Sequence, residues 1–331
     1  MIMSLGVDTS RIIYANPTKD STHLNFAARV GVKQVTFDNS DELHKLKARH
    51  PSAELFVRIT TDDSGSLCSF KDKFGASLDI TKNLLATAKS LGLNVVGVSF
   101  HVGSGDADPY SPSKAAAFVK AVQDARIVFD QAAVIGYDLK TLDIGGGFSG
   151  DRFEVVAETL SPVLDNNFPP SIRIISEPGR YYVSSAFTLA NRIIGADVKR
   201  SPSVMGMPYK LTLNDGVYGN FAAIFYDHMD PVPQILSKRN PSNQSTNYML
   251  WGQTCDGLDA IKESYTLNGL LNEGDWLFFE EMGAYTKCCA MSFNGFTDAH
   301  DVVYVSSVPG ASALLGYTTR LSIGGVARAK V

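Results

Sequence analysis

The sequence predicts a mixed fold, in which an α/β part built on a parallel sheet is followed by an all-β part. Up to about residue 180, short β-branched runs alternate with longer helical patterns, which is typical of parallel strands joined by crossover helices. From about Ser184, strand-like runs follow one another without long helices, which is typical of an antiparallel β domain. A length of 331 residues, 44% of them apolar, fits about two domains.

Six apolar runs are expected as strands in the first half. They span residues 11–15, 34–38, 54–60, 95–101, 141–145 and 173–177. Apolar residues recur three and four apart in 40–50, 80–92 and 115–136, so these segments are expected to be helices. The alternation fits either an open doubly wound sheet or a closed (β/α)8 barrel. A barrel needs eight strands, so on that alternative two βα units of about 30 residues each are absent from the start.

The second half is expected to form a mostly antiparallel β domain. Its predicted strands lie within residues 186–200, 209–215, 247–252, 275–285 and 301–307. Turns rich in glycine, proline and asparagine separate them. The tail after Pro309 has weak periodicity, and no element is assigned to it.

Composition and charge exclude several classes of function. A net charge of −4 and no run of like charge argue against a nucleic-acid partner and against an anionic membrane surface. No stretch is long and apolar enough to span a bilayer, and the N-terminus has no secretion signal. Cys68, Cys255, Cys288 and Cys289 show no metal-ligand spacing and no disulfide framework. We therefore expect a cytoplasmic protein without a metal.

A glycine run directly follows the fifth predicted strand, in "TLDIGGGFSGD" at 141–151. Gly145, Gly147 and Gly150 match GxGxxG, with Asp165 twenty residues beyond Gly145, which on paper is a dinucleotide fingerprint. That acid should end the next strand, but it lies at a helix end before two prolines. A backbone nest for a phosphate is the better interpretation, and a nucleotide-binding oxidoreductase remains the weaker alternative.

Two further loops follow predicted strands. In "SFHVGSG", His101 ends an apolar strand and Ser104 stands between two glycines. In "SEPGRYY", Glu177 and Arg180 flank a Pro-Gly turn. The structural interpretations are that His101 is a buried histidine with its hydrogen bonds made, and that Glu177 and Arg180 form a salt bridge that fixes their loop. Because these loops share one end of the sheet with the glycine run, a common phosphate and ring site is the alternative.

Two short segments of the β domain also carry candidate chemistry. "GQTCDGLD" places Cys255 beside Asp256 in a turn flanked by glycines. These polar and small neighbours are unusual for a buried thiol and favour a reactive or proton-donating one. "YDH" adds Tyr226 and Asp227. Asp227 fits a group that binds a substrate cation as well as it fits a solvated turn residue.

Taken together, these motifs identify a resemblance. "ANP" at 15–17, "SFHVGSG", "LDIGGGF", "EPGRYY", "NDGVYG", "CDGLD", "GDW" and "MGAYT" occur in the order and spacing of the eukaryotic-type ornithine decarboxylases. These are group IV decarboxylases that use pyridoxal 5'-phosphate (PLP). The resemblance runs from about Ser10 to about Ser307. It implies a PLP-binding (β/α)8 barrel of the alanine-racemase type over 1–183, lacking its first two strands here, a β domain over 184–310, and an unassigned tail over 311–331.

The resemblance also implies roles for individual residues. His101 would stack on the cofactor ring, Glu177 would pair with the ring nitrogen, and Arg58 would lie near the ring oxygen. Cys255 would protonate the α-carbon once CO2 has left, and Asp227, Asp256 and Tyr226 would bind the distal ammonium of ornithine. Putrescine would be the product, and a head-to-tail homodimer would share its active sites. The groups implied for the cofactor phosphate are Ser104, Gly145, Gly146, Gly147, Gly179, Arg180 and Tyr285.

One departure from the family is large. Its cofactor-linking lysine lies on the first barrel strand in an Ala-Val-Lys type motif, which this chain does not contain. Lys33, Lys120 and Lys199 lie in the wrong places to replace it. The first hypothesis is therefore an incomplete version of an active decarboxylase. The second is a non-catalytic homologue that binds antizyme through residues 31–55, and the third is the oxidoreductase.

Overall fold

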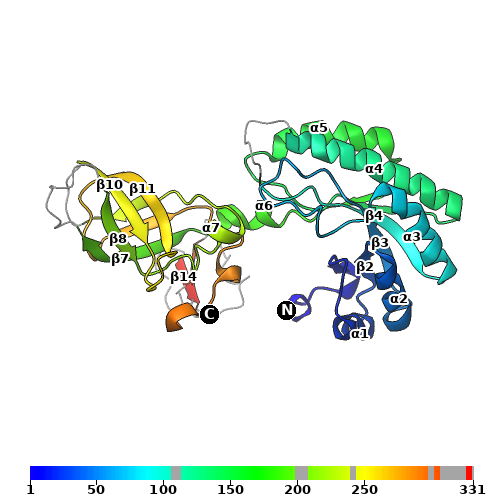
Figure 1. The fold of residues 1–331 in the computed structure, drawn as a ribbon, viewed down its shortest axis with the longest axis horizontal. Helices are drawn as coiled ribbons and strands as arrows, with labels where there is room; N and C mark the ends of the chain where they lie inside the picture. Colours follow the sequence, from blue (N-terminus) through cyan, green and yellow to red (C-terminus); the bar gives the residue numbers. More distant parts are fainter. Residues whose placement is uncertain (106–112, 198–207, 239–243, 297–301, 306–325, 330–331) are drawn as a thin grey trace. The chain divides into compact units, whose positions relative to one another are not determined.

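The computed structural model describes residues 1–105, 113–197, 208–238, 244–296, 302–305 and 326–329. The chain divides into two compact units, Met1–Ser184 and Ser185–Val331 (Figure 1). Lys199 and most of the tail that the sequence left unassigned lie outside the described residues. Each unit is described by itself.

The first unit is built on a six-stranded parallel sheet. Its strands are β1 (Ile13–Tyr14), β2 (Gln34–Phe37), β3 (Glu54–Arg58), β4 (Asn94–Ser99), β5 (Thr141–Asp143) and β6 (Arg173–Ile175). They pair in sequence order, from β1 at one edge to β6 at the other, and every pairing in this sheet is parallel. Each predicted strand of the first half is present.

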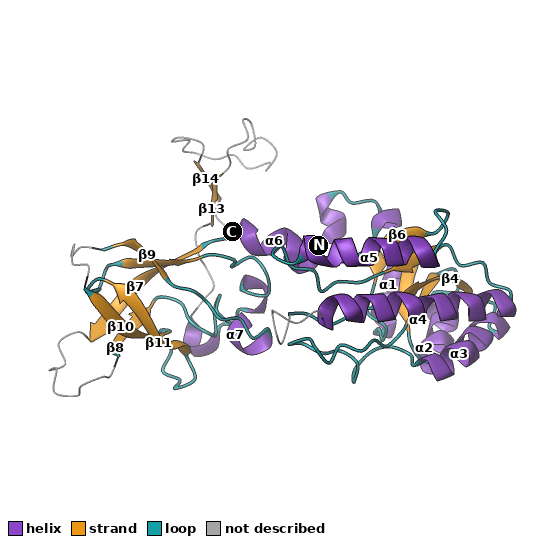
Figure 2. Ribbon diagram, turned by 90° about the horizontal axis from the view of Figure 1, so that it is seen from above, coloured by secondary structure: helices purple, strands orange, loops and turns teal. Residues whose placement is uncertain are grey.

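Helices connect these strands and lie in an arc around the sheet (Figures 1 and 2). They are α1 (Ser21–Val30), α2 (Ser40–Arg49), α3 (Leu78–Ser90), α4 (Ser113–Ile135), α5 (Phe153–Asn167) and the short α6 (Gly179–Val183). From α1 to α5, each helix packs against the next. A doubly wound sheet reverses its strand order and places helices on both faces, so the sequential order identifies barrel-type winding. The predicted barrel-type fold class is confirmed.

Local sequence explains where these helices begin and end. The side chain of Asp20 caps the start of α1 by accepting from the Thr22 N–H, and Gly31, with φ 84°, ends it. Asn39 caps α2 in the same way through the Glu42 N–H. Both caps satisfy backbone donors that have no partner within the helix. The apolar spacing in the sequence predicts α2, whereas no helix is predicted at α1.

Apolar side chains of the strands and helices form one core in this unit. Leu55, Phe56 and Val57 of β3 are all fully buried, as expected for a strand covered on both faces. Leu43 and Leu46 of α2, which are three residues apart and so lie on one face of the helix, are also fully buried. Burial of each such side chain contributes about 1.5–3 kcal/mol, and the core fixes the strand ends that carry the candidate site.

The second unit contains a six-stranded mixed sheet in the order β11-β10-β8-β7-β12-β9. Among the described strands of this unit, β8 and β10 form a parallel pair and the other pairs are antiparallel. The elements are β7 (Leu189–Asp197), β8 (Tyr209–Leu213), α7 (Ala223–Tyr226), β9 (Gln234–Ser237), β10 (Ser245–Trp251), β11 (Ala260–Asn268), β12 (Trp276–Phe279), and the separate pair β13 (Val302–Val305) and β14 (Val326–Ala329). The mostly antiparallel prediction therefore fits, although β9, β11 and β14 were not assigned from sequence.

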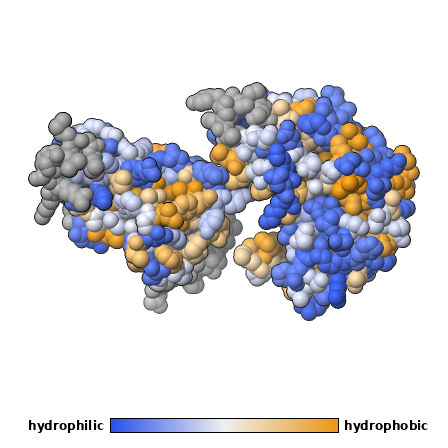
Figure 3. Space-filling view, in the orientation of Figure 1, coloured by the Kyte–Doolittle hydropathy of each residue, from blue (hydrophilic) through white to orange (hydrophobic). Residues whose placement is uncertain are grey.

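Surface polarity differs between parts of the first unit. In Figure 3 the face around α1 and α2 is mainly blue, whereas the N-terminal turn Ile2–Leu5 exposes apolar side chains. No helix in the described part of the chain has the length and apolar character needed to cross a membrane.

Candidate active site

Three predicted residues meet at the carboxyl ends of the parallel strands. Arg58 ends β3, His101 follows β4 and Glu177 follows β6. All three line one cavity of about 60 Å³. Its other lining residues are Ala15, Thr36, Ser99 and Phe100. The carboxyl ends of parallel strands share one edge of the sheet, so the sequence order of the strands brings these side chains together.

The glycine run is packed against the two neighbouring loops. A Cβ on Gly145 would lie 2.0 Å from the Phe100 carbonyl oxygen, and its φ is 64°. A Cβ on Gly146 would lie 2.8 Å from the Glu177 carbonyl oxygen and 2.8 Å from His101 Nε2. The backbone of Gly145 and Gly146 therefore lies so close to these two loops that a side chain would not fit at either position. Gly147, with φ 95°, continues the turn.

The orientation of the His101 ring is set by the loop that follows it. The Gly103 N–H donates to His101 Nδ1 at 3.1 Å, so a neutral ring carries its proton on Nε2. Thr61 Oγ1 donates to the His101 carbonyl oxygen at 2.8 Å. The Phe70 ring meets the imidazole nearly at right angles, with centroids 5.0 Å apart. The imidazole is therefore held between its own loop and the loop after β3.

Ser104 and Arg180 form the next pair of predicted residues. Arg180 Nη2 donates to Ser104 Oγ at 3.3 Å. Two backbone hydrogen bonds, of 2.9 and 3.1 Å, tie Ser104 to Cys68, so the serine loop is fixed on its other side. The Gly179 N–H donates to the Glu177 carbonyl oxygen at 2.8 Å. Hydroxyl and guanidinium donors thus converge beside the glycine run, as a phosphate site requires.

Arg58 carries a partly buried positive charge among several acids. Burial lowers the pKa of its guanidinium, whereas Glu177, Asp38 and then Asp143 act in the opposite direction. Its guanidinium carbon lies 4.8 Å from the centre of the Phe74 ring. An arginine keeps its proton in proteins, so Arg58 supplies a permanent cation to the cavity.

Asp143, the last residue of β5, is an acid at this edge that sequence reasoning did not select. Its side chain is fully buried, and burial, followed by the charge of Glu177, raises its pKa to about 8. Its Oδ2 and the Oγ of Ser99 are buried atoms without a hydrogen-bond partner among the described residues. The signal in the sequence was a single aspartate between Leu142 and Ile144, which by itself does not reveal its burial.

A buried lysine adjoins this edge but is fully engaged. Lys19 Nζ donates to the carbonyl oxygens of Asn16, Pro17 and Thr36 at 2.6–3.0 Å, and it pairs with Glu42 Oε1 at 2.8 Å. Burial lowers the pKa of the ammonium, and Glu42 opposes that shift. Lys19 therefore joins the loop after β1 to β2 and α2.

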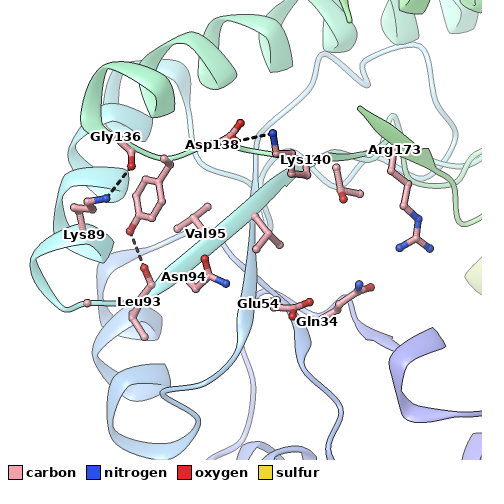
Figure 4. Close-up of a pocket in the computed structure, with 14 residues that line it drawn as sticks. Gln34, Glu54, Lys89, Leu93, Asn94, Val95, Gly136, Asp138, Lys140 and Arg173 are labelled. Carbon is pink, nitrogen blue, oxygen red and sulfur yellow. Dashed lines mark hydrogen bonds and ion pairs between the residues drawn. The ribbon is translucent and has the colours of Figure 1, made fainter. Parts of the chain in front are cut away.

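A larger cavity, of about 750 Å³, lies at the opposite edge of the sheet (Figure 4). Gln34, Glu54, Asn94, Thr141 and Arg173, which begin β2 to β6, line it. Its other polar side chains bond locally, for example Lys140 with Asp138 at 2.6 Å and Lys89 with the Gly136 carbonyl oxygen at 2.8 Å. No predicted site residue lines this cavity, so its size does not make it the candidate site.

In the second unit, Cys255 is held by an asparagine from a different loop. The Cys255 N–H and Sγ both lie 3.1 Å from Asn294 Oδ1. Asn294 has φ 56°, a left-handed conformation that asparagine tolerates better than most residues. The Cys255 thiol is exposed, and its hydrogen points to a carbonyl acceptor.

Asp256, the neighbouring acid, also has a fixed partner. The Tyr218 hydroxyl donates a short hydrogen bond to Asp256 Oδ2. This bond is the main reason that the pKa of Asp256 lies below its usual value, and it raises the pKa of Tyr218 to about 12. The Tyr218 ring stacks on Phe293, with centroids 4.3 Å apart. Asp256 therefore stays ionised at neutral pH.

A buried aspartate joins the two loops that carry these residues. Asp259 is fully buried, and its carboxylate accepts from the Val217 N–H and from the Thr254 N–H and hydroxyl at 2.7–2.9 Å. Gly216 and Gly252 leave room for it, since a Cβ on either would lie about 2.1–2.2 Å from Asp259 Oδ1. The positions of Tyr218 and Cys255 are thus linked.

The remaining predicted residues surround this turn less closely. Tyr226 ends α7 and is exposed, and Asp227 follows it. The charge of Asp227 acts on Cys289, and Tyr226 interacts with Tyr218. Tyr285 is exposed and has φ 57°. In the part of the chain that the structure describes, no group of three histidine, cysteine or acidic side chains could hold a metal ion.

Residues 1–184 match the sequence model of the pyridoxal-binding domain of pyridoxal-dependent decarboxylases. The chain therefore belongs to the pyridoxal-dependent decarboxylase family, and its glycine run is part of a pyridoxal-binding domain. The ornithine decarboxylase of Neurospora crassa is 51% identical over 95% of this chain and 70% of that protein. Antizyme inhibitor 2 of Xenopus laevis is 45% identical over 89% of this chain and 66% of that protein.

A solved structure agrees with this assignment. The arginine decarboxylase of Paramecium bursaria Chlorella virus has a TM-score of 0.82 at 34% identity, over 89% of this chain and 77% of that chain. The predicted family, enzyme class and PLP cofactor are confirmed.

The residues present fit PLP. Ser104 Oγ and the Arg180 guanidinium suit a phosphate, and the planar His101 ring suits an aromatic partner. The exposed Glu177 carboxylate and the unpartnered Ser99 Oγ are polar groups ready for a ligand. No lysine is among the described residues that line the cavity.

Proposed function

We propose that this chain is a PLP-dependent carboxy-lyase that acts on L-ornithine, releasing CO2 and putrescine. The observation that carries the proposal is the exposed turn where the ionised Asp256 stands beside the Cys255 thiol, each held by its own partner. A carboxylate that stays charged selects a cationic side chain, and an adjacent thiol is a proton donor. Identity with an ornithine decarboxylase over 95% of the chain supports the same substrate.

The first unit would hold the cofactor. Bound PLP supplies a protonated pyridine ring that accepts the electron pair left behind when CO2 departs. Glu177 would accept a hydrogen bond from the ring nitrogen, and His101 would lie against the ring. Ser104, Arg180 and the glycine run would bind the phosphate, with Tyr285 of the second unit as a further donor. Arg58 would face the ring oxygen.

The second unit would recognise the substrate. Asp256 and Asp227, with Tyr226 next to Asp227 in sequence, would bind the distal ammonium. Cys255 Sγ, whose hydrogen is held by Asn294, would donate its proton to the α-carbon. We further propose that Cys255 and Asp256 act in the site of a second copy of the chain, in a head-to-tail homodimer. All four cysteines are free thiols, which suits a reducing cytoplasm.

This chain should bind PLP without a covalent link. Lys19 is occupied by three carbonyl groups and Glu42. Peptide mapping after borohydride reduction is therefore expected to find no lysine labelled in proportion to bound PLP. A lysine labelled at one equivalent would overturn this expectation.

Two stable conjugates test the substrate assignment without requiring turnover. Reduced phosphopyridoxyl-L-ornithine differs from phosphopyridoxyl-L-norvaline only by the distal ammonium. Calorimetry is expected to give the ornithine conjugate an affinity about 10- to 100-fold higher, as a charged hydrogen bond contributes about 1.5–3 kcal/mol. Equal affinities, or binding of neither conjugate, would contradict the proposal. Release of labelled CO2 from carboxyl-labelled ornithine, compared with lysine and arginine, then measures activity.

Two variants serve as a matched pair in that titration. Asp256→Asn should reduce the preference for the ornithine conjugate to less than about threefold, because only the charge of the acceptor is lost. Asp138→Asn removes an exposed acid of the first unit, at the sheet edge opposite the proposed cofactor site. This variant should leave the preference unchanged. A loss of preference in both variants would indicate a general charge effect.

A second candidate function is binding to antizyme, favoured by the identity with antizyme inhibitor 2. The outer face of α2 exposes His44, Lys47 and Arg49, within the segment that resembles the antizyme-binding region. Lys47→Glu combined with Arg49→Glu should abolish capture of the chain by immobilised antizyme if this face binds it. Unchanged capture would exclude the face.

A further inference from the structure

Asp143 occupies a position at the cofactor edge that leaves its backbone no freedom. It ends β5, which pairs with β4 on one side and β6 on the other. Its carbonyl oxygen accepts from the Phe100 N–H at 3.1 Å, and the next residue, Ile144, donates to the Ile175 carbonyl at 2.9 Å. The carboxyl group is therefore presented from a fixed point.

The two carboxyl oxygens of Asp143 have different surroundings. Oδ1 accepts from the Gly145 N–H at 2.9 Å, which also holds the first glycine of the run. Oδ2 is buried and has no donor among the described residues. A buried ionised oxygen without a donor is costly, whereas a protonated one becomes a donor itself.

The acceptor for such a proton is Glu177. Its carboxyl group interacts directly with that of Asp143, and together with burial it raises the pKa of Asp143. Among the described residues, the charged or titratable groups beside this pair are Arg58 from β3 and His101 after β4. Asp38 and Asp63 act on the same arginine. One cation thus faces two adjacent acids, and two adjacent carboxylates favour sharing one proton.

We propose that Asp143 is a positioning residue that keeps a proton on Oδ2 at neutral pH and donates it to Glu177, so that the Glu177 carboxylate is held toward the cofactor ring. The part that concerns the ring rests on the proposed function. The pairing itself rests on the residues of the first unit alone.

Burial decides which of the two acids keeps the proton. Asp143 is fully buried, whereas Glu177 is exposed at the end of the edge strand β6. Burial disfavours the charged form, so the proton stays on Asp143 and the charge on Glu177. Glu177 is then an ionised acceptor, which is the form that pairs with a protonated ring nitrogen.

Carbon NMR of the full chain with labelled aspartate carboxyls tests the pairing without any cofactor. The Asp143 signal, assigned from its loss in Asp143→Asn, is expected to titrate near pH 8. Glu177→Gln should move that midpoint down, because a neighbouring negative charge is removed. A midpoint below about pH 6 would overturn the proposal, since an ordinary aspartate titrates near 4. A midpoint that Glu177→Gln leaves unchanged would do so too.

The affinity for PLP tests the positioning role. Asp143→Asn keeps the acceptor for Gly145 and supplies a permanent donor to Glu177, so its affinity should stay within about twofold of the wild-type value and remain flat from pH 7 to 9. The affinity of the wild type for PLP should fall over that range. The affinity of Asp143→Ala for PLP should be about tenfold lower than that of the wild type at pH 7, because one net hydrogen bond to a charged group is lost. A pH profile shared by the wild type and Asp143→Asn would overturn the role. Absence of PLP binding in every variant, with the NMR result intact, would count against the proposed function and not against the pairing.

Discussion

The Tyr218 hydroxyl donates to the carboxylate of Asp256 across 38 residues of sequence. Tyr218→Phe removes this donor and keeps the ring that stacks on Phe293. The pKa of Asp256, which the bond holds below its usual value, is expected to rise. The affinity for phosphopyridoxyl-L-ornithine should then fall earlier as the pH is lowered toward 4. Identical pH profiles for the two proteins would show that the tyrosine does not tune the acid.

Gly145 and Gly179 differ in what a side chain would meet. Gly145→Ala is expected to lower the free energy of unfolding of the first unit by at least about 1–2 kcal/mol from its positive φ alone. The clash of the added Cβ with the Phe100 carbonyl oxygen, 2.0 Å away, adds to this loss. Gly179→Ala is the control, because nothing lies within 4 Å of the added carbon. Thermal melts of both variants measure the difference, and equal losses would contradict the packing argument.

Asn294 should restrain the reactivity of the Cys255 thiol. Asn294→Gly permits the same backbone conformation and removes the oxygen that accepts from Cys255. Loss of one hydrogen bond of about 1 kcal/mol predicts a several-fold faster alkylation of Cys255. Mass spectrometry resolves this thiol from Cys288, which serves as an internal reference. Asn294→Asp retains an acceptor and should alkylate no faster than the wild type.

The buried pair of Lys19 and Glu42 should be important for the stability of the first unit. Lys19→Met leaves the Glu42 carboxylate buried, with Lys45 at 2.6 Å as its remaining cation. A loss of about 3 kcal/mol in urea unfolding is expected, because breaking one side of a buried pair leaves an uncompensated charge. The double variant Lys19→Met with Glu42→Leu should lose less than the single variant. The reverse order would contradict this account.

The stability of the first unit should decrease as the pH rises from about 4 to about 8. Folding raises the pKa of Asp143 from 3.8 to about 8, so in this window the folded chain keeps a proton that the unfolded chain has released. The unfolded state therefore gains in stability with pH. Melting temperatures at pH 5 and pH 8.5 should differ less for Asp143→Asn than for the wild type. An equal difference in both proteins would contradict this assignment.

The sequence predicted the winding of the first unit because local signals coincide with its topology. Each parallel strand lies in a short run rich in apolar residues, the inner strands are buried, and most helices are long and periodic. The helix α1 was missed although Asp20 and Gly31 mark its two ends, since its ten residues include only two buried apolar side chains. The strand β11 was missed because lysine, glutamate and serine interrupt its apolar alternation.

The candidate site was predictable only where its residues lie in sequence motifs. His101, Glu177 and the glycines follow strands, so strand order alone places them together. The contact of Asn294 with Cys255 joins residues that are 39 positions apart, and no local pattern encodes it. Asp143 escaped notice because its role depends on burial, which a strand of three residues does not reveal.

The strand orders of the two sheets imply that the sheets form at different stages of synthesis on the ribosome. In the first unit each new strand joins an edge that the preceding strand has already formed, so the sheet can grow as the chain emerges. In the second unit β12 lies between β7 and β9, both of which precede it in the chain. That sheet must wait for residue 279 before its strands can close, and its contacts over long sequence separations make it the slower part to form.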